Sequence, residues 1–443
     1  MSVHQQQEMT TRRLRLKNRE AINRLRLVLV MGILLCALET VCIINVQAAD
    51  WPQWQGPDRD AISKETGLLR EWPEGGPRLL RSVTGIGKGF SSPSIADGVL
   101  YVTGMEDNVE FLSAFDLTGN AKWKKEYGKA YGKSNPDART TPTVDGDSVY
   151  VVSGTGEVVC FDAASGSIKW SVPALDEFGG KQGSWGTAES PLIVDNKVIY
   201  TPCGEKTTIV AFDKNTGQTV WASRSLNDQS GYVSPIVVER GGKKLIVTVT
   251  GNYIIGVNAE NGDIEWQIKY TEIPPPKSGN DINIVTPLYH DGRIFVTSGY
   301  DHTGVMLELS EDGASASVAW WNQDLDTHHG GVVLVDSYIY GSNWINNQNG
   351  NWVCLNWDSG ETMYEKKWHN KGSIISAEGM LYCYEEKDGN LALVKAAPED
   401  FSIVSSFEIT QGEGPHWAHP VISDGVLYIR HGDVLMAYDI KPE

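Results

Sequence analysis

The stretch Ala114-Phe115-Asp116-Leu117-Thr118-Gly119, followed by Trp123, decides the fold because it recurs along the chain of 443 residues. Its eight copies stand about 39 to 51 residues apart, a spacing typical of repeat proteins built from small sheets. The other copies run from Cys160 to Trp170, Ala211 to Trp221, Val257 to Trp266, Leu307 to Trp320, Cys354 to Gly360, Leu391 to Phe407 and Leu435 to Asp439.

A second phrase lies between successive copies. In most units it is Ser-Pro or Thr-Pro followed by two short apolar runs around a turn, as in Ser92-Pro93 to Gly104. Several of these turns are Asp-Gly, a dipeptide that accepts the positive φ of tight hairpins. Each unit therefore predicts four antiparallel strands: one after Ser/Thr-Pro, one after the turn, the Ala-Phe-Asp strand and an outer Trp strand.

Eight such units predict an all-β fold, an eight-bladed β-propeller of four-stranded antiparallel blades. A ring is expected because a linear array would leave unpaired strand edges. The last unit ends at Asp439 without a Trp strand, whereas Pro77 to Val83 resembles a Trp strand with no unit before it. We expect this N-terminal strand to close the last blade. We also expect the Trp side chains to pack between neighbouring blades, where large rings bury most area.

The chain divides into three parts. Residues 1–48 are predicted to be a signal peptide or an N-terminal membrane anchor, residues 49–77 an N-terminal extension, and residues 78–443 the propeller. Basic side chains precede the apolar run 27–46, and Val46-Gln47-Ala48 offers small residues for cleavage. The run is also long enough to span a bilayer if it stays uncut. We therefore expect an exported, periplasmic or cell-envelope protein, with membrane attachment through residues 27–46 as the open alternative.

The charge of the chain bears on its partners. The formal net charge is −18 at pH 7, and residues 1–48 hold seven basic and three acidic side chains, so the remainder carries −18 − 4 = −22. A strongly negative surface repels nucleic acid and anionic lipid headgroups. We expect no nucleic-acid partner, and we expect a monomer.

The recurring Ala-Phe-Asp-x-x-Thr-Gly-x-x-x-Trp phrase resembles the pyrroloquinoline-quinone (PQQ) repeat over about residues 78 to 440. That family holds quinoprotein alcohol dehydrogenases and non-catalytic propellers such as the outer-membrane barrel-assembly lipoprotein. The resemblance implies the fold more than the function. The dehydrogenases place a disulfide between adjacent cysteines against the quinone, and a calcium ion beside a catalytic Asp. Here Cys160, Cys203, Cys354 and Cys383 are not adjacent, and no calcium ligand set is evident.

The segments that lead into the inner strands are expected to gather at one end of the central channel. Their polar and aromatic side chains differ from unit to unit, as the walls of a ligand site do. We predict no metal ion among them, because the histidine spacing matches no metal motif. The candidate ligand-binding residues at this channel mouth are Lys88, Arg139, Trp185, Glu189, Tyr232, Asp281, His328, His329, Lys371, His416, Trp417 and His419.

The four cysteines of the propeller leave two interpretations open. An even number in an exported chain permits disulfides, and Cys203 and Cys383 both fall on second strands. Cys160 and Cys354 instead occupy the position of Ala in the recurring phrase, so the favoured interpretation is that they are small buried side chains.

Two functions follow from these patterns. The favoured one is a non-catalytic binding or scaffold protein outside the cytoplasm, with an envelope protein, a peptide or a glycan as partner and no cofactor. The alternative is a quinone-dependent oxidoreductase acting on alcohols or sugars, with PQQ and calcium. In that alternative His416, His419 or Glu189 is the base, and Arg139 or Lys371 binds the carboxylates of the quinone.

Overall fold

The structure of the protein is a computed structural model that describes residues 50–274 and 282–442. The described residues belong to one compact unit. The predicted leader or anchor (1–48) and the candidate Asp281 lie outside the described residues. Within the described ranges, no helix has the length and apolarity that a membrane crossing requires.

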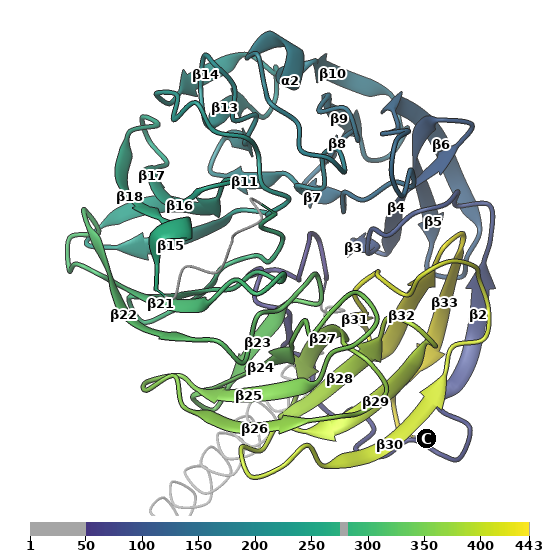
Figure 1. Cartoon of the computed structure of the whole chain (residues 1–443). Coiled ribbons are helices and arrows are strands. Elements are labelled where there is room, and N and C mark those ends of the chain that lie inside the picture. The colour runs from purple at the N-terminus through teal and green to yellow at the C-terminus, as the bar shows by residue number, and fades with distance from the viewer. Residues whose placement is uncertain (1–49, 275–281, 443) are drawn as a thin grey trace, which may run out of the picture. The chain divides into compact units, whose positions relative to one another are not determined.

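The predicted all-β fold is confirmed, since the described strands form eight sheets in chain order around a ring (Figure 1). Blade 1 consists of β3 (Ser94–Ala96), β4 (Val99–Glu106), β5 (Val109–Asp116) and β6 (Ala121–Lys129), and blade 2 of β7 (Thr143–Asp145), β8 (Ser148–Val152), β9 (Val158–Asp162) and β10 (Ile168–Val172). Blade 3 consists of β11 (Leu192–Val194), β12 (Lys197–Tyr200), β13 (Val210–Asp213) and β14 (Thr219–Ala222), and blade 4 of β15 (Ile236–Arg240), β16 (Lys243–Val249), β17 (Tyr253–Asn258) and β18 (Ile264–Lys269).

Blades 5 to 8 continue in the same order. Blade 5 consists of β19 (Leu288–His290), β20 (Arg293–Val296), β21 (Gly304–Leu309) and β22 (Ala316–Asn322), and blade 6 of β23 (Val332–Val335), β24 (Tyr338–Ser342), β25 (Trp352–Asn356) and β26 (Thr362–Lys366). Blade 7 contains β27 (Gly372–Ala377), β28 (Met380–Glu385), β29 (Asn390–Lys395) and β30 (Ile403–Glu408). Blade 8 consists of β31 (Val421–Ser423), β32 (Val426–His431) and β33 (Val434–Asp439), and β2 (Arg78–Val83) is its fourth strand.

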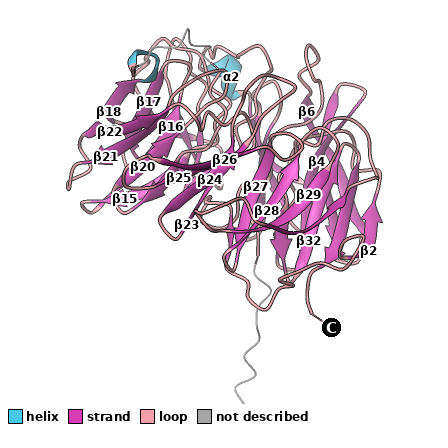
Figure 2. Cartoon of the chain, turned by 60° about the horizontal axis from the view of Figure 1, so that its bottom comes forward, coloured by secondary structure: helices cyan, strands magenta, loops and turns pink. Residues whose placement is uncertain are grey.

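Helix is confined to two short elements in the described residues, α2 (Ala174–Glu177) and η1 (Tyr270–Glu272), as Figure 2 shows. The ring closes as the sequence predicts, because β2 pairs antiparallel with β33, from Arg78 opposite Asp439 to Val83 opposite Leu435. In Figure 1 the purple β2 lies at the outer edge of the last blade, drawn in yellow. The first and last parts of the propeller thus share one sheet, which removes a free edge.

Tryptophans of the outer strands hold neighbouring blades together, as predicted. Trp123 of blade 1 lies against Gly166 of blade 2, and its indole N–H donates to the carbonyl of Ala163 at 3.1 Å. A Cβ at Gly166 would stand 2.6 Å from that ring, and its φ of +69° also favours glycine. The same contact recurs at Trp170 with Lys214 and Gly217, Trp221 with Ala259 and Gly262, and Trp320 with Trp357 and Gly360.

Other interfaces depart from this pattern, as where Gly119 of blade 1 lies against Val83 and Arg81 of β2. Between blades 4 and 5, Gly313 contacts Leu245 and Arg240 instead of an outer-strand tryptophan. The Arg240 guanidinium donates from Nε to the carbonyl of Ser310 at 3.3 Å. The copy of the recurring phrase from Leu307 to Trp320 therefore makes a different contact with blade 4.

The N-terminal extension is built into the ring. Trp51 forms an antiparallel bridge with Ile95 of blade 1, and the Ser376 N–H of blade 7 donates to the Ala61 carbonyl at 2.9 Å. The following strand β1 (Ile62–Ser63) pairs in parallel with β27, so blade 7 has five strands where the sequence predicts four. In Figure 1 this purple segment crosses the middle of the ring. Residues 51–63 therefore link blade 1 to blade 7, with blade 8 between them in the ring.

The four cysteines of the propeller, Cys160, Cys203, Cys354 and Cys383, are buried free thiols. Cys160 and Cys354 lie on the third strands β9 and β25, in agreement with the favoured interpretation that they replace alanine. Cys203 and Cys383 form no disulfide, so the alternative of a covalent link between blades is not seen.

Candidate functional site

The segments before the inner strands enclose a pocket at one end of the channel, which we call the mouth pocket. Its cavity volume is about 190 Å³. Its walls come from seven blades and from the N-terminal extension. The residues that line it are Trp54, Gln55, Phe90, Asn135, Arg139, Trp185, Ala188, Tyr232, Ser234, Ile282, Ile284, Val285, Thr286, Tyr300, His328, His329, Gly331, Trp417 and His419.

Sequence reasoning brought together much of this lining. Seven of the twelve candidates line the pocket: Arg139, Trp185, Tyr232, His328, His329, Trp417 and His419. Whether they bind a ligand stays a prediction.

Four other candidates lie outside the lining. Lys88 is exposed. Glu189 is buried, and the Thr201 backbone N–H and hydroxyl donate to its carboxylate at 3.2 and 3.1 Å. Lys371 is buried and pairs with Glu386, and His416 is buried beside Tyr384, whose hydroxyl approaches its Nδ1 at 2.5 Å. The side chains of Glu189, Lys371 and His416 contact groups inside the wall of the channel. They therefore do not line the pocket, although each precedes an inner strand.

Trp54 of the extension was not among the candidates. Its ring lies 4.5 Å from that of His419, and its indole N–H donates to the Thr286 hydroxyl at 2.8 Å. The signal available in the sequence was the pair of tryptophans Trp51 and Trp54 in a segment outside any repeat. Buried aromatic side chains in a segment without its own sheet indicate that the segment packs against something else.

Arg59 anchors the extension deep in the channel. It is buried, and its guanidinium donates to the carbonyl of Pro235 at 2.8 Å, to that of Ser190 at 3.3 Å and to that of Pro191. Its Nε donates to Gln53 Oε1 at 2.9 Å. Burial lowers the pKa of Arg59 to about 9, while the nearby Glu189 acts in the opposite direction. The buried guanidinium of Arg59 therefore joins blades 3 and 4 to the N-terminal extension.

The walls of the pocket are mainly aromatic. Ring centroids lie 5.8 Å apart for Trp185 and Tyr232, 4.9 Å for Phe90 and Trp417, and 5.1 Å for His329 and Trp417. Aromatic pairs at such distances stabilise one another and present flat apolar faces. Such faces suit the apolar or aromatic part of a ligand.

Arg139 supplies positive charge at the rim of the pocket. Its guanidinium donates to the Ser134 carbonyl at 2.7 Å and to the Asn135 carbonyl, and it lies 5.7 Å from the ring of Tyr131. Its second terminal nitrogen has no hydrogen-bond partner among the described residues. A guanidinium oriented in this way can bind a carboxylate or another anionic group of a ligand.

The histidines of the pocket are neutral at physiological pH. Burial lowers the pKa of His328 to about 3, that of His419 to about 4, and that of His329 well below its usual value. His419 Nε2 donates to the His329 carbonyl at 2.8 Å, which fixes its ring. Neutral imidazoles offer lone pairs and N–H groups to a ligand without adding charge.

Comparison with known proteins agrees with this architecture. A family model described as outer membrane protein assembly factor BamB, built on the PQQ repeat, matches residues 110–366. The chain belongs to this family. BamB of Bordetella pertussis is 22% identical over 263 residues, which cover 58% of this chain and 60% of that protein. BamB of Salmonella typhimurium is 25% identical over 186 residues, which cover 41% of this chain and 43% of that protein. The chain thus matches less than two thirds of the length of these curated family members.

Solved structures of low identity share the fold. The crystal structure of BamB from Moraxella catarrhalis has a TM-score of 0.60 at 14% identity, and the match covers 82% of this chain and 99% of that one. A europium-containing methanol dehydrogenase has a TM-score of 0.63 at 12% identity, with 87% and 90% covered. At these identities the structural similarity establishes the fold alone. Whether the pocket fits a quinone cofactor therefore has to be decided from its side chains.

The side chains of the mouth pocket do not fit a calcium-bound quinone. Among its described lining residues there is no Asp, no Glu and no Cys, although a calcium site is built mainly from carboxylate and carbonyl oxygens. Glu386, which lies beside the pocket histidines, is engaged by the Lys371 ammonium at 2.6 Å. Of the groups named for the oxidoreductase alternative, Glu189 and Lys371 have partners inside the wall, whereas His419 and Arg139 line the pocket.

Proposed function

We propose that this chain is a non-catalytic binding or scaffold protein of the cell envelope, which holds a segment of a partner in the mouth pocket. The observation that carries the proposal is the character of that pocket: aromatic walls, neutral imidazoles and one guanidinium with a free nitrogen. Such a site complements an apolar or aromatic group next to a carboxylate.

A protein is the partner that we favour over a glycan. The family members from Bordetella pertussis and Salmonella typhimurium are named outer membrane protein assembly factors, and this points to proteins of the envelope as partners. A peptide segment also supplies the side chains that an aromatic pocket with one cation would bind. The net charge of about −22 outside the leader supports this choice over a nucleic acid or an anionic lipid surface.

The proposal is tested with single substitutions in the pocket. Arg139→Ala, Trp185→Ala and Trp417→Ala should each leave the circular dichroism and melting temperature close to those of the unchanged protein, because these side chains are only partly buried. Each should reduce capture of a specific envelope component from solubilised native envelope. Removal of an aromatic or arginine anchor at the centre of an interface costs about 2 kcal/mol or more, roughly 30-fold in affinity.

Lys88→Ala is the matched control, because Lys88 precedes an inner strand but is exposed outside the pocket lining. Its capture should equal that of the unchanged protein. The proposal fails if all four variants capture the same components in the same amounts.

The oxidoreductase alternative predicts a different response. Pyrroloquinoline quinone with calcium would raise the melting temperature and give dye-linked oxidation of alcohols or sugars. We expect neither, since the described pocket side chains lack an anionic set for calcium. A cofactor-dependent shift in melting temperature together with dye reduction would favour the oxidoreductase.

A further inference from the structure

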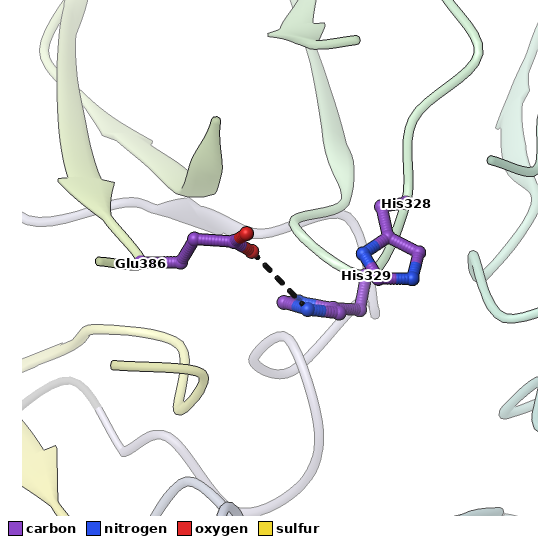
Figure 3. A group of neighbouring side chains, drawn as sticks. All are labelled: His328, His329 and Glu386. Carbon is purple, nitrogen blue, oxygen red and sulfur yellow. Dashed lines mark ion pairs between the residues drawn. The ribbon is translucent and has the colours of Figure 1, made fainter. Parts of the chain in front are cut away.

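Two adjacent histidines of blade 6 and a glutamate of blade 7 converge beside the mouth pocket. His328 and His329 belong to the segment before β23, and Glu386 directly follows β28. One ligand atom from each of the three side chains lies within 4.8 Å of the other two. Figure 3 shows the Glu386 carboxylate directed at the ring of His329, 3.2 Å away, with His328 beside it.

Each of these side chains keeps one buried polar atom unpaired. The atoms without a hydrogen-bond partner among the described residues are His328 Nδ1, His329 Nε2 and Glu386 Oε2. The 3.2 Å approach of His329 to Glu386 therefore lacks the geometry of a hydrogen bond. A single unpaired buried polar atom costs about 1–3 kcal/mol, so three such atoms around one point indicate a missing shared partner.

The remaining atoms of the three side chains are held by other groups. His328 Nε2 is 2.9 Å from the Tyr300 hydroxyl, a contact compatible with the tautomer in which Nε2–H donates and Nδ1 carries a lone pair. Glu386 Oε1 accepts from the Lys371 ammonium at 2.6 Å, and that ammonium also donates to the carbonyls of Asn346 and Asn347. These contacts fix the orientation of the ligand side chains, as outer partners do in protein metal sites.

We propose that His328 Nδ1, His329 Nε2 and Glu386 Oε2 bind a divalent transition-metal ion of zinc-like chemistry, with a fourth position open to the mouth pocket. Two imidazoles and one carboxylate with an open position are a common zinc ligand set. Bonds of about 2.0–2.1 Å in a tetrahedron place ligand atoms about 3.4 Å apart, so the three atoms need to approach by at most roughly 1.4 Å. The inference goes beyond the proposed function, which requires no metal.

The protonation states of the three groups support the site. Burial lowers the pKa of both histidines, so their lone pairs are available at neutral pH. Burial raises the pKa of Glu386 to about 7, with Lys371 acting in the opposite direction. The Lys371 ammonium therefore favours the ionised carboxylate, which is the form that binds a metal ion.

No spacing in the sequence indicates this site, and from the sequence we predict no metal ion. His328 and His329 are adjacent, and Glu386 lies in the next blade, so the set matches no spaced motif. Only the closure of one blade against the next brings the three ligands together.

The test uses the full chain after removal of metals with a chelator. Titration with Zn²⁺ in a calorimeter should give one site, and Co²⁺ should give the visible absorption of a tetrahedral complex. Glu386→Gln and His329→Asn should each lower the Zn²⁺ affinity by about 100-fold or more, since loss even of an outer partner costs about 10–100-fold. Tyr300→Phe, which removes such an outer partner, should lower it by about 10-fold.

His290→Asn is the control, because His290 is exposed on β19 and is not in the group. Its affinity should be unchanged. Anomalous diffraction from crystals soaked in Zn²⁺ gives a second measurement that does not depend on variants, and it should place the ion between the three side chains.

The proposal is overturned if no ion lies there, or if Glu386→Gln binds Zn²⁺ as tightly as the unchanged protein. Failure is separable from that of the proposed function. Partner capture in the presence of the chelator measures the binding role alone, and metal binding without a partner measures this site alone.

Discussion

Substitution of Arg59 by methionine should release the N-terminal segment from the channel. Arg59 is buried and is the donor for the carbonyls of Ser190 and Pro235. Methionine keeps much of the volume but leaves these two oxygens without that donor, at about 1–3 kcal/mol each. Removal of a buried cation returns part of its desolvation cost. We expect the free energy of unfolding to fall by roughly 3 kcal/mol, with residues 51–63 the first to open.

The assay is amide hydrogen exchange of the full chain, followed by mass spectrometry of peptides covering residues 51–63. A loss of roughly 3 kcal/mol corresponds to exchange about 150-fold faster, since about 1.4 kcal/mol is a factor of ten. The melting temperature should fall by about 4 °C for a unit of this size. Arg78→Met is the control, because its ion pair with Asp439 is exposed and contributes under about 1 kcal/mol. Unchanged protection of residues 51–63 in Arg59→Met would refute the anchoring role of Arg59.

Two further predictions concern the interface between blades and the pocket histidines. Gly166→Ala should destabilise the protein by roughly 2–4 kcal/mol in urea unfolding, because its Cβ would meet the Trp123 ring at a positive φ. Gly146→Ala, with positive φ but open space around it, should cost only about 1 kcal/mol, and equal losses would contradict the packing argument. His419 is neutral in the folded protein down to about pH 4 and protonates near 6.5 when unfolded. The stability that the neutral His419 gives to the folded protein is therefore fully present above pH 6.5. Acidification to pH 4 lowers the free energy of unfolding by roughly 3 kcal/mol through this residue. His419→Gln should show a correspondingly smaller loss of stability between pH 6.5 and pH 4.5, and identical pH profiles would argue against a buried neutral imidazole.

The ring could be predicted because its information is local and repeated. The phrase around Phe115 and Trp123 encodes a turn, a strand edge and a contact with the next blade, and the same contact recurs at Trp170, Trp221 and Trp320. The missing outer strand of the last blade and the orphan strand before blade 1 then imply closure, which the pairing of β2 with β33 confirms.

The mouth pocket could be predicted only in part. Position in the repeat brought Trp185, Tyr232 and Trp417 together among the candidates, and the structure shows all three in the lining of the mouth pocket. Position in the repeat does not tell which side chains face the cavity. Lys371, for example, points into the wall and pairs with the buried Glu386.

The role of the extension could not be predicted from the repeat. Trp54 and Arg59 have no equivalents in the blades, and their partners lie up to 232 residues away in the chain. Their placement depends on the shape of the channel that the assembled blades leave, and no local pattern records that shape. The position of Glu386 could not be predicted either, because its contact with His329 joins two neighbouring blades.

The most direct test of a binding pocket at the channel mouth is site-specific photocrosslinking in living cells that produce the full chain. Benzoylphenylalanine at Trp185 should give a discrete adduct with one envelope component, and Arg139→Ala in the same chain should abolish that adduct. The same amino acid at Trp321, an exposed outer-strand position 46% accessible to solvent, should give none. Adducts of the same identity and yield at both positions, or none at Trp185, would contradict the account.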